Sequence, residues 1–401
     1  MSVFYRKMIP RLKPAINAAE LLAALRPDGL DEIRLFEEDF AQLMGQKHAV
    51  AFPYGRTGLI YLLTALGLKG KEIICPAYTC VVVPHAIVYS GSTPVFIDCA
   101  PDGFNMDLDL AGKSITGNTG AIVATSIFGY PVDLDRIKAI QEKHPQIKII
   151  QDCAHSFAAE WKGRPVQKQG EAAIFGLNIS KLLTSIFGGM VTTDSDKLYH
   201  DLKQLRDRHL TVSDWKKTLR RLLYFLSLYP TFWEPLYGLV NRLERSGILN
   251  HFTQYYDDAK IDMPDDYRLQ MSSLEAKIGR CNIHKYRKIL AARRVAAKIY
   301  FTGLPNLPEF QLPPEIDGAT YSHFVVQVPD RKQWMEYGLK KGIQLGQLIE
   351  YNIPEMESYG SHPRGSYPLS AKYSRSTINL PVYGGEEVAK SVVRIVKKHI
   401  Q

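Results

Sequence analysis

Short apolar runs of strand length alternate with segments of helix length from about residue 30 to residue 200, and this alternation limits the fold more than any other feature. The strand-length runs are AVAF (49–52), EIICP (72–76), PVFIDC (94–99), AIVATSIFG (121–129) and IKIIQDC (147–153). Intervening stretches such as GLIYLLTALGL (58–68) have the length and spacing of helices. The pattern predicts an α/β fold with a mostly parallel, doubly wound sheet. Ligands of such sheets bind beyond the carboxyl ends of the strands, so the residues after each run are the first site candidates.

The length of the chain and its later pattern predict two domains. A chain of 401 residues can bury more than one core. We expect residues 1–290 to form a large domain. Residues 291–401 contain a strand pattern, HFVVQVPD, between helix patterns, which predicts a small α+β domain. The segment 205–260 interrupts the alternation and reads as a basic, aromatic helical insert in the large domain.

Composition narrows the class of protein. Hydrophobic residues make up 45% of the chain and charged residues 23%, which is ordinary for a globular protein. The net charge of +9 is spread along the chain, so a nucleic-acid groove is not expected. Five scattered cysteines, without a CxxC or Cys/His metal spacing, indicate reduced thiols and no metal site. The basic start MSVFYRKMIPRLKPAI lacks the apolar region of a signal peptide, so we expect a cytoplasmic protein.

One lysine stands out within AAIFGLNISKLLTSIFGGMVTTD (172–194). Lys181 lies between two apolar runs that read as buried strands, 172–175 and 191–193. A lysine that enters the interior loses hydration of its charge unless it gains a partner or a covalent bond. Lys181 is therefore a candidate for chemistry.

Polar residues at other strand ends could share a ligand with this lysine. Gly55, Arg56 and Thr57 follow the first run and open a helix, which suits a phosphate group, although the same residues could form an ordinary glycine turn with a solvated arginine. Asp152 closes the run 147–153, where it could cap a helix or hold a proton on a pyridine nitrogen. His155 follows one turn later, and its importance depends on Asp152.

Tyr78 and Cys80 follow the run 72–76 at a level where a side chain could cover an aromatic ring. A lysine, an aspartate at a strand end, an anion-binding helix start and a ring-covering residue together make the set that pyridoxal 5'-phosphate requires. The residues themselves therefore indicate this cofactor.

The sequence resembles the sugar aminotransferases of the DegT type, within the fold-type I pyridoxal-phosphate enzymes. The segments that carry the resemblance are FEEDFAQLMGQKHAVAFPYGRTGL, EIICPAYTCVVVPHAIVYSGSTPVFIDC, IFGYPVDLDRI, QDCAHSFAAEWKGRPVQKQGEAAIFG, GGMVTTD, DYRLQMSSLEAKIG and INLPVYGGEE, in the order of the family. They cover most of the chain.

The resemblance implies a role for individual residues. Lys181 matches the lysine that forms a Schiff base with the cofactor and moves the proton, and Asp152 matches the partner of the pyridine nitrogen. His155 falls where the family often has Gln beside the phenolic oxygen. Tyr267 and Arg268 match a segment that reaches the partner subunit's cofactor, so a homodimer with shared active sites is implied. Gly55, Arg56 and Thr57 fall at the phosphate loop.

Several positions depart from the family. Cys80 stands where the family has Trp or Phe, so Tyr78 or His155 could cover the ring instead. Gly176 replaces a serine that helps to hold the phosphate, with Asn178 and Ser180 as possible substitutes. The residue before the Tyr-Arg pair is Asp266 where the family has Asn, and we hypothesise that Arg56 offsets its charge.

The resemblance implies transfer of an amino group from glutamate to a keto-sugar, most simply one carried by a nucleotide, in polysaccharide or glycoconjugate biosynthesis. A sugar dehydratase of the same family is an alternative, although those enzymes carry His where this chain has Lys181. A non-catalytic regulatory or membrane-associated protein on the same fold is another alternative.

The insert contains DWKKTLRRLLYFLSLYPTFWEPLYGLVNRLERSG, where this chain is longer than its relatives. Five residues recur at helical spacing behind a cluster of lysines and arginines, and they are Trp215, Leu219, Leu222, Leu223 and Leu226. The uncharged stretch 222–233 is too short to cross a bilayer. Residues 215–245 could lie in the interface of the inner membrane face, or pack as helices over the active site or the dimer interface.

Overall fold

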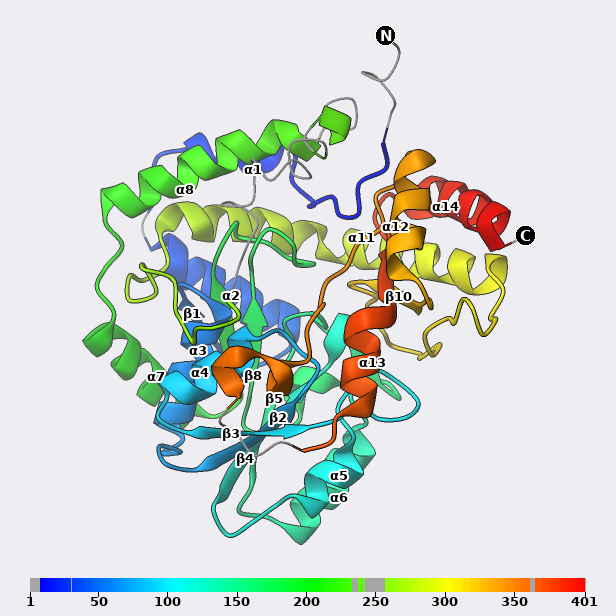
Figure 1. The fold of residues 1–401 in the computed structure, drawn as a ribbon. Coiled ribbons are helices and arrows are strands. Elements are labelled where there is room, and N and C mark those ends of the chain that lie inside the picture. Colours follow the sequence, from blue (N-terminus) through cyan, green and yellow to red (C-terminus); the bar gives the residue numbers. More distant parts are fainter. Residues whose placement is uncertain are drawn as a thin grey trace.

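A seven-stranded sheet forms the centre of the computed structural model, which describes residues 8–29, 31–232, 237–239, 241, 257–360 and 365–400 (Figure 1). The strands lie in the order β1-β9-β8-β5-β4-β2-β3. Their bounds are β1 (His48–Phe52), β2 (Glu72–Pro76), β3 (Thr93–Ile97), β4 (Thr119–Thr125), β5 (Lys148–Asp152), β8 (Ala172–Gly176) and β9 (Gly189–Thr193). β9 pairs antiparallel with β1 and β8, and the pairs from β8 through to β3 are parallel. The predicted mostly parallel sheet is confirmed.

Both faces of the sheet are buried, as alternate residues of its strands show. Ile149 packs into one apolar cluster with α2, and its neighbour Ile150 packs into another on the opposite face. Ile74 and Ile73 divide in the same way. Side chains alternate between the faces of a strand, so a continuous apolar run is what a sheet covered on both sides requires.

Helices of the large domain connect and cover the strands. They are α1 (Ala18–Leu25), α2 (Glu32–Met44), α3 (Gly55–Ala65), α4 (Val82–Tyr89), α5 (Leu108–Lys113), α6 (Leu134–Lys143) and α7 (Asp196–His209). α2 shows how the sequence specifies one of them. Phe36, Phe40 and Met44 recur every four residues, so they share one face, and all three are buried. Gly45 ends the helix with φ +66°, a conformation that glycine adopts without strain.

A 31-residue helix, α11 (Ser273–Gly303), joins the two parts of the chain. It begins with a capping box between Ser272 and Glu275. It packs against α1 and α2 and also against α14 (Gly385–Ile400) of the C-terminal part. The predicted domain boundary at 290/291 falls inside this helix, which runs through both parts. The division into the domains 1–290 and 291–401 stays a prediction.

The C-terminal part has a two-stranded antiparallel sheet with helices around it. Its elements are β10 (Phe324–Gln327), α12 (Arg331–Lys340), η4 (Ile353–Glu355), η5 (Glu357–Tyr359), α13 (Pro368–Ser376) and β11 (Thr377–Leu380), followed by α14. Short elements elsewhere are η1 (Ile127–Gly129), β6 (Glu160–Trp161), β7 (Arg164–Pro165) and η2 (Val166–Lys168). The α+β character expected for this part is confirmed.

The insert begins as a helix, α8 (Trp215–Leu228), followed by η3 (Tyr229–Phe232). α8 packs on α11, at the same end of the molecule as α1 (Figure 1). Most of the second half of the predicted insert, residues 233–236, 240 and 242–256, lies outside the described residues.

Candidate active site

Asp152 and Lys181 meet at the carboxyl ends of β5 and β8. Asp152 is the last residue of β5 and is 3% exposed. Its carboxylate accepts hydrogen bonds from the Thr125 hydroxyl (3.1 Å) and the Ala154 N–H (3.0 Å). Burial raises the pKa of Asp152, and these two donors and the nearby Lys181 oppose the rise. A carboxylate in this state gains from a further cation or a protonated ring nitrogen beside it.

Lys181 is held by a short turn that follows β8. The Asn178 side-chain oxygen accepts from the Ser180 N–H (3.1 Å) and hydroxyl (2.7 Å), and the Lys181 N–H donates to the Asn178 carbonyl (3.0 Å). Asn178 and Ser180 therefore shape the loop that presents the lysine. Burial lowers the pKa of Lys181, although Cys80 and Asp152 act against it. A lowered pKa leaves more of the amine neutral and nucleophilic near neutral pH.

The start of α3, beside this pair, has the features of an anion site. No side chain caps the helix at Tyr54, so the first N–H groups, from Gly55 to Thr57, are available to an anion. The Thr57 hydroxyl is buried and has no hydrogen-bond partner among the described residues. A Cβ at Gly189 would lie 2.2 Å from the Gly55 nitrogen, so only glycine allows β9 to approach the turn this closely. The predicted phosphate loop thus has a free donor for a phosphate oxygen.

His155 is a neutral donor in the same site. Its Nδ1 accepts a hydrogen bond from the Phe128 N–H (3.2 Å), which places the ring proton on Nε2. Burial lowers the pKa of His155 well below its ordinary value, and Lys181 and His323 add to the effect. The rings of His155 and His323 lie 5.4 Å apart. His155 therefore keeps one proton to donate to an acceptor such as a phenolic oxygen.

Tyr78 and Cys80 take different places. Tyr78 is 1% exposed, and its hydroxyl bonds to the hydroxyl of Thr377 (3.1 Å) on β11. Its ring packs against Phe128 and Tyr373. These contacts hold Tyr78 in the core between the sheet and the C-terminal part, and a role for it in covering a cofactor ring stays a prediction.

Cys80 is partly buried near the charges of Lys181 and Arg56. Burial lowers the pKa of Arg56. Lys181 and Arg56 therefore both lie near Cys80, which stays a candidate cofactor contact.

Tyr267 and Arg268 lie at the surface. Tyr267 makes an edge contact with Tyr89 at the end of α4, and the Arg268 guanidinium donates to the Tyr267 hydroxyl (2.9 Å). Arg268 is exposed. Their reach toward a second subunit stays a prediction.

The hypothesis that Arg56 offsets the charge of Asp266 is wrong. Asp266 pairs instead with Arg221 on α8 (2.7 Å) and accepts a hydrogen bond from the Tyr54 hydroxyl (2.5 Å). Arg221 also pairs with Glu275 on α11 (3.2 Å). The insert therefore supplies the cation that Asp266 needs.

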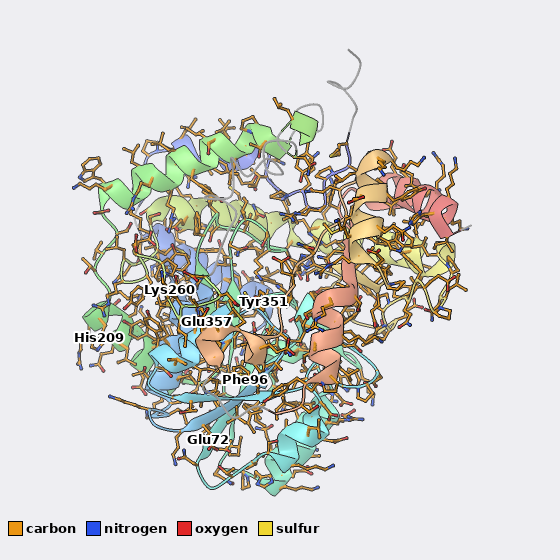
Figure 2. All side chains as sticks on the ribbon, viewed as in Figure 1. Glu72, Phe96, His209, Lys260, Tyr351 and Glu357 are labelled. Carbon is orange, nitrogen blue, oxygen red and sulfur yellow. The ribbon has the colours of Figure 1, made fainter. Side chains whose placement is uncertain are left out.

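Sequence reasoning missed His323 and Tyr351. His323 lies beside His155 and Lys181, and Tyr351 lies near the charge of Arg56. The Tyr351 hydroxyl accepts a hydrogen bond from the Val81 N–H (3.0 Å), and the residue lies near the middle of the molecule (Figure 2). Both come from the C-terminal part, and no local pattern marks them, since only tertiary packing brings that part over the sheet.

The chain is similar to known proteins in both sequence and fold. The chain is 23% identical over 376 residues to a GDP-perosamine synthase of Vibrio cholerae, covering 91% of this chain and 89% of the relative. It is 25% identical over 391 residues to the spore coat polysaccharide biosynthesis protein SpsC of Bacillus subtilis, covering 91% and 90%. The PLP form of Spr1654 of Streptococcus pneumoniae, described as a putative sugar aminotransferase, superposes with a TM-score of 0.76 at 20% identity, covering 98% of this chain and 99% of the other.

The model of the DegT/DnrJ/EryC1/StrS aminotransferase family matches residues 28–398, nearly the whole chain. The chain belongs to this family of pyridoxal-phosphate-dependent, fold-type I sugar aminotransferases.

Proposed function

We propose that this protein uses pyridoxal 5'-phosphate to transfer an amino group from glutamate to a keto-sugar carried by a nucleotide. The observation that carries the proposal is the meeting of the buried Asp152 carboxylate with the Lys181 amine next to the uncapped start of α3. The relatives named for GDP-perosamine synthesis and spore coat polysaccharide support a nucleotide-linked sugar and a role in cell-surface polysaccharide. We place the reaction in the cytoplasm and expect nucleotide-linked sugars there to be its substrates.

The residues present fit the cofactor. The free hydroxyl of Thr57 and the N–H groups from Gly55 onward would hold its phosphate. Asp152 would hold the proton of the ring nitrogen, and His155 would donate its Nε2 proton to the phenolic oxygen. When bound, pyridoxal phosphate supplies an aldehyde that joins amines and a ring that accepts electron density.

Lys181 does the proton transfer in this proposal. Its lowered pKa provides a neutral amine that can take a proton from the carbon that carries the substrate nitrogen and return it to the carbon on the other side of that nitrogen. Asp152 keeps a negative charge beside the ring nitrogen while this happens. Lys181 is partly buried beyond the carboxyl end of β8, and this position keeps the amine near the reacting atoms.

We also propose a homodimer in which each site uses residues of both subunits. Tyr267 and Arg268 lie at the surface of one chain, with the Arg268 guanidinium exposed. In a twofold dimer these side chains could reach the phosphate site of the second copy.

Spectroscopy with purified protein tests the function. Protein incubated with pyridoxal phosphate should gain a visible absorbance band that glutamate bleaches, and the bleached form should aminate a keto-sugar nucleotide, detected by mass spectrometry in a screen of GDP- and TDP-linked sugars. Lys181→Ala should lose the band. Lys148→Ala is the matched control, because Lys148 lies on the same sheet but pairs with Glu171 at the surface. Absence of a band in the wild-type protein, or a band that glutamate leaves unchanged, would reject the proposal.

A further inference from the structure

Two cations of the helix α8, Lys217 and Arg221, face the protein. The Lys217 side chain is fully buried, donates to the carbonyls of Leu269 (3.1 Å) and Gln270 (2.7 Å), and lies 3.7 Å from Glu275. The Arg221 side chain, 11% exposed, pairs with Glu275 and Asp266. These contacts determine which side of α8 faces the protein.

Four apolar side chains of α8 point outward, whereas Phe225 is buried and Leu222 packs against the same inner cluster. Trp215 is 70% exposed, Leu219 44%, Leu223 57% and Leu226 39%. Spacings of three and four residues put them on one side of the helix. A helix on the surface of a globular protein ordinarily buries its leucines and exposes its lysines and arginines, so three exposed leucines beside the inward-facing Lys217 and Arg221 depart from the usual arrangement.

A second helix near α8 also exposes apolar side chains. α1 lies at the same end of the molecule as α8 (Figure 1), and Ala24 of α1 shares a small apolar cluster with Phe225 of α8. On α1, Leu22 is 68% exposed and Leu25 60%. We call the four exposed apolar residues of α8 the apolar face, which consists of Trp215, Leu219, Leu223 and Leu226.

Rotating α8 to bury its leucines would be costly. The rotation would break the contacts of Lys217 and Arg221 and leave Glu275 without cations in the interior. The ion pairs therefore keep the leucines in water, where several large apolar side chains together mark a surface with a binding partner.

Charge distinguishes between the partners. Lys216 and Arg220 are exposed on one flank of the leucines, and residues 215–228 contain no acidic side chain. A twofold second copy on this face would bring the same cations together. A surface of anionic lipid would instead attract them while the apolar side chains enter its headgroup region, where tryptophan is favoured.

We propose that the apolar face docks the protein on the surface of a membrane that contains anionic lipid. The helix would lie in the plane of the interface. Its 14 residues span only about 21 Å, less than the roughly 30 Å of a hydrocarbon core. None of the described helices is long and apolar enough to cross a membrane. The proposal does not depend on the reaction that the active site performs.

Co-sedimentation with vesicles tests the docking. The full-length protein with cofactor should pellet with vesicles of phosphatidylcholine mixed with phosphatidylglycerol, less at about 1 M salt than at about 0.1 M salt, and much less with pure phosphatidylcholine. Leu219→Glu with Leu223→Glu replaces two apolar side chains by anions, so the bound fraction should fall at least about tenfold. The matched control is Leu110→Glu with Val295→Glu, at 42% and 45% exposed positions on α5 and α11, and it should pellet like wild type.

Each other outcome would overturn the proposal. A wild-type protein that stays in the supernatant has no such lipid affinity, and equal binding to neutral vesicles would remove the role of Lys216 and Arg220. Light scattering of both double variants then compares their oligomeric states, which tests whether the apolar face joins two copies of the chain. If only the α8 variant loses a dimer, the apolar face is an interface between copies and not a lipid surface.

Discussion

Replacing Arg221 by Met removes the cation that connects the insert to the large domain. The guanidinium pairs with Asp266 (2.7 Å) and Glu275 (3.2 Å) and donates to the Tyr54 hydroxyl (2.8 Å). Burial alone would lower the pKa of Arg221, but Glu275, Tyr54 and Asp266 more than offset this, and the pKa is raised. The arginine is therefore charged at all ordinary pH values.

The charges of this cluster balance, which determines the size of the effect. Lys217 and Arg221 face Glu275 and Asp266, so Arg221→Met leaves one buried negative charge without a partner. Breaking a buried pair in this way costs about 3–5 kcal/mol. We expect the lower end of this range, because Asp266 is 11% exposed and water can reach it. For 401 residues, an unfolding entropy of about 2 cal/mol/K per residue makes this loss a fall of about 4 °C in Tm.

Scanning calorimetry of the purified protein with saturating cofactor measures the change. Asp266→Asn in the Arg221→Met background restores the charge balance, so the double variant should regain about 2 kcal/mol relative to the sum of the single variants. Arg220→Met is the control, since Arg220 is the neighbouring arginine on α8 and is exposed. The reasoning fails if Arg221→Met melts at the temperature of Arg220→Met, or if Asp266→Asn brings no recovery.

Three further predictions concern the active site. Thr57→Val should weaken the cofactor Kd about tenfold in a fluorescence titration without lowering the Tm of the cofactor-free protein, because it removes only an unpartnered hydroxyl; an unchanged Kd would contradict the phosphate site. The rate at which cofactor-free protein captures pyridoxal phosphate should rise with pH, with its midpoint at the lowered pKa of Lys181. Asp152→Asn should move that midpoint further down, because Asp152 raises the pKa of Lys181. A midpoint at the ordinary lysine pKa argues against burial of the amine. Inactive Lys181→Ala and Arg268→Ala proteins, when mixed, should regain partial activity through one intact hybrid site, and no recovery would remove support for shared sites.

The sequence alone determined the sheet and much of the site. Runs such as 147–153 are mostly apolar and of strand length, so they predicted buried strands of a mostly parallel sheet, and the structure has strands at these runs. The residues that follow these strands had to lie at one edge of the sheet, which is why Asp152, Lys181 and the α3 start could be named together. Hydrophobic period and strand direction are local properties, and they survive in any packing of the chain.

The tertiary structure decided which side chains meet. His323 reaches His155, and Tyr78 bonds to Thr377, across more than 160 residues of sequence in each case. Similarly, Asp266 was expected to need Arg56, but α8 brings Arg221 to it. The helical spacing of α8 predicted an apolar stripe but could not tell which side faces the protein. Its orientation follows from buried Glu275 and Asp266, since a desolvated carboxylate requires a cation more strongly than an exposed leucine requires cover.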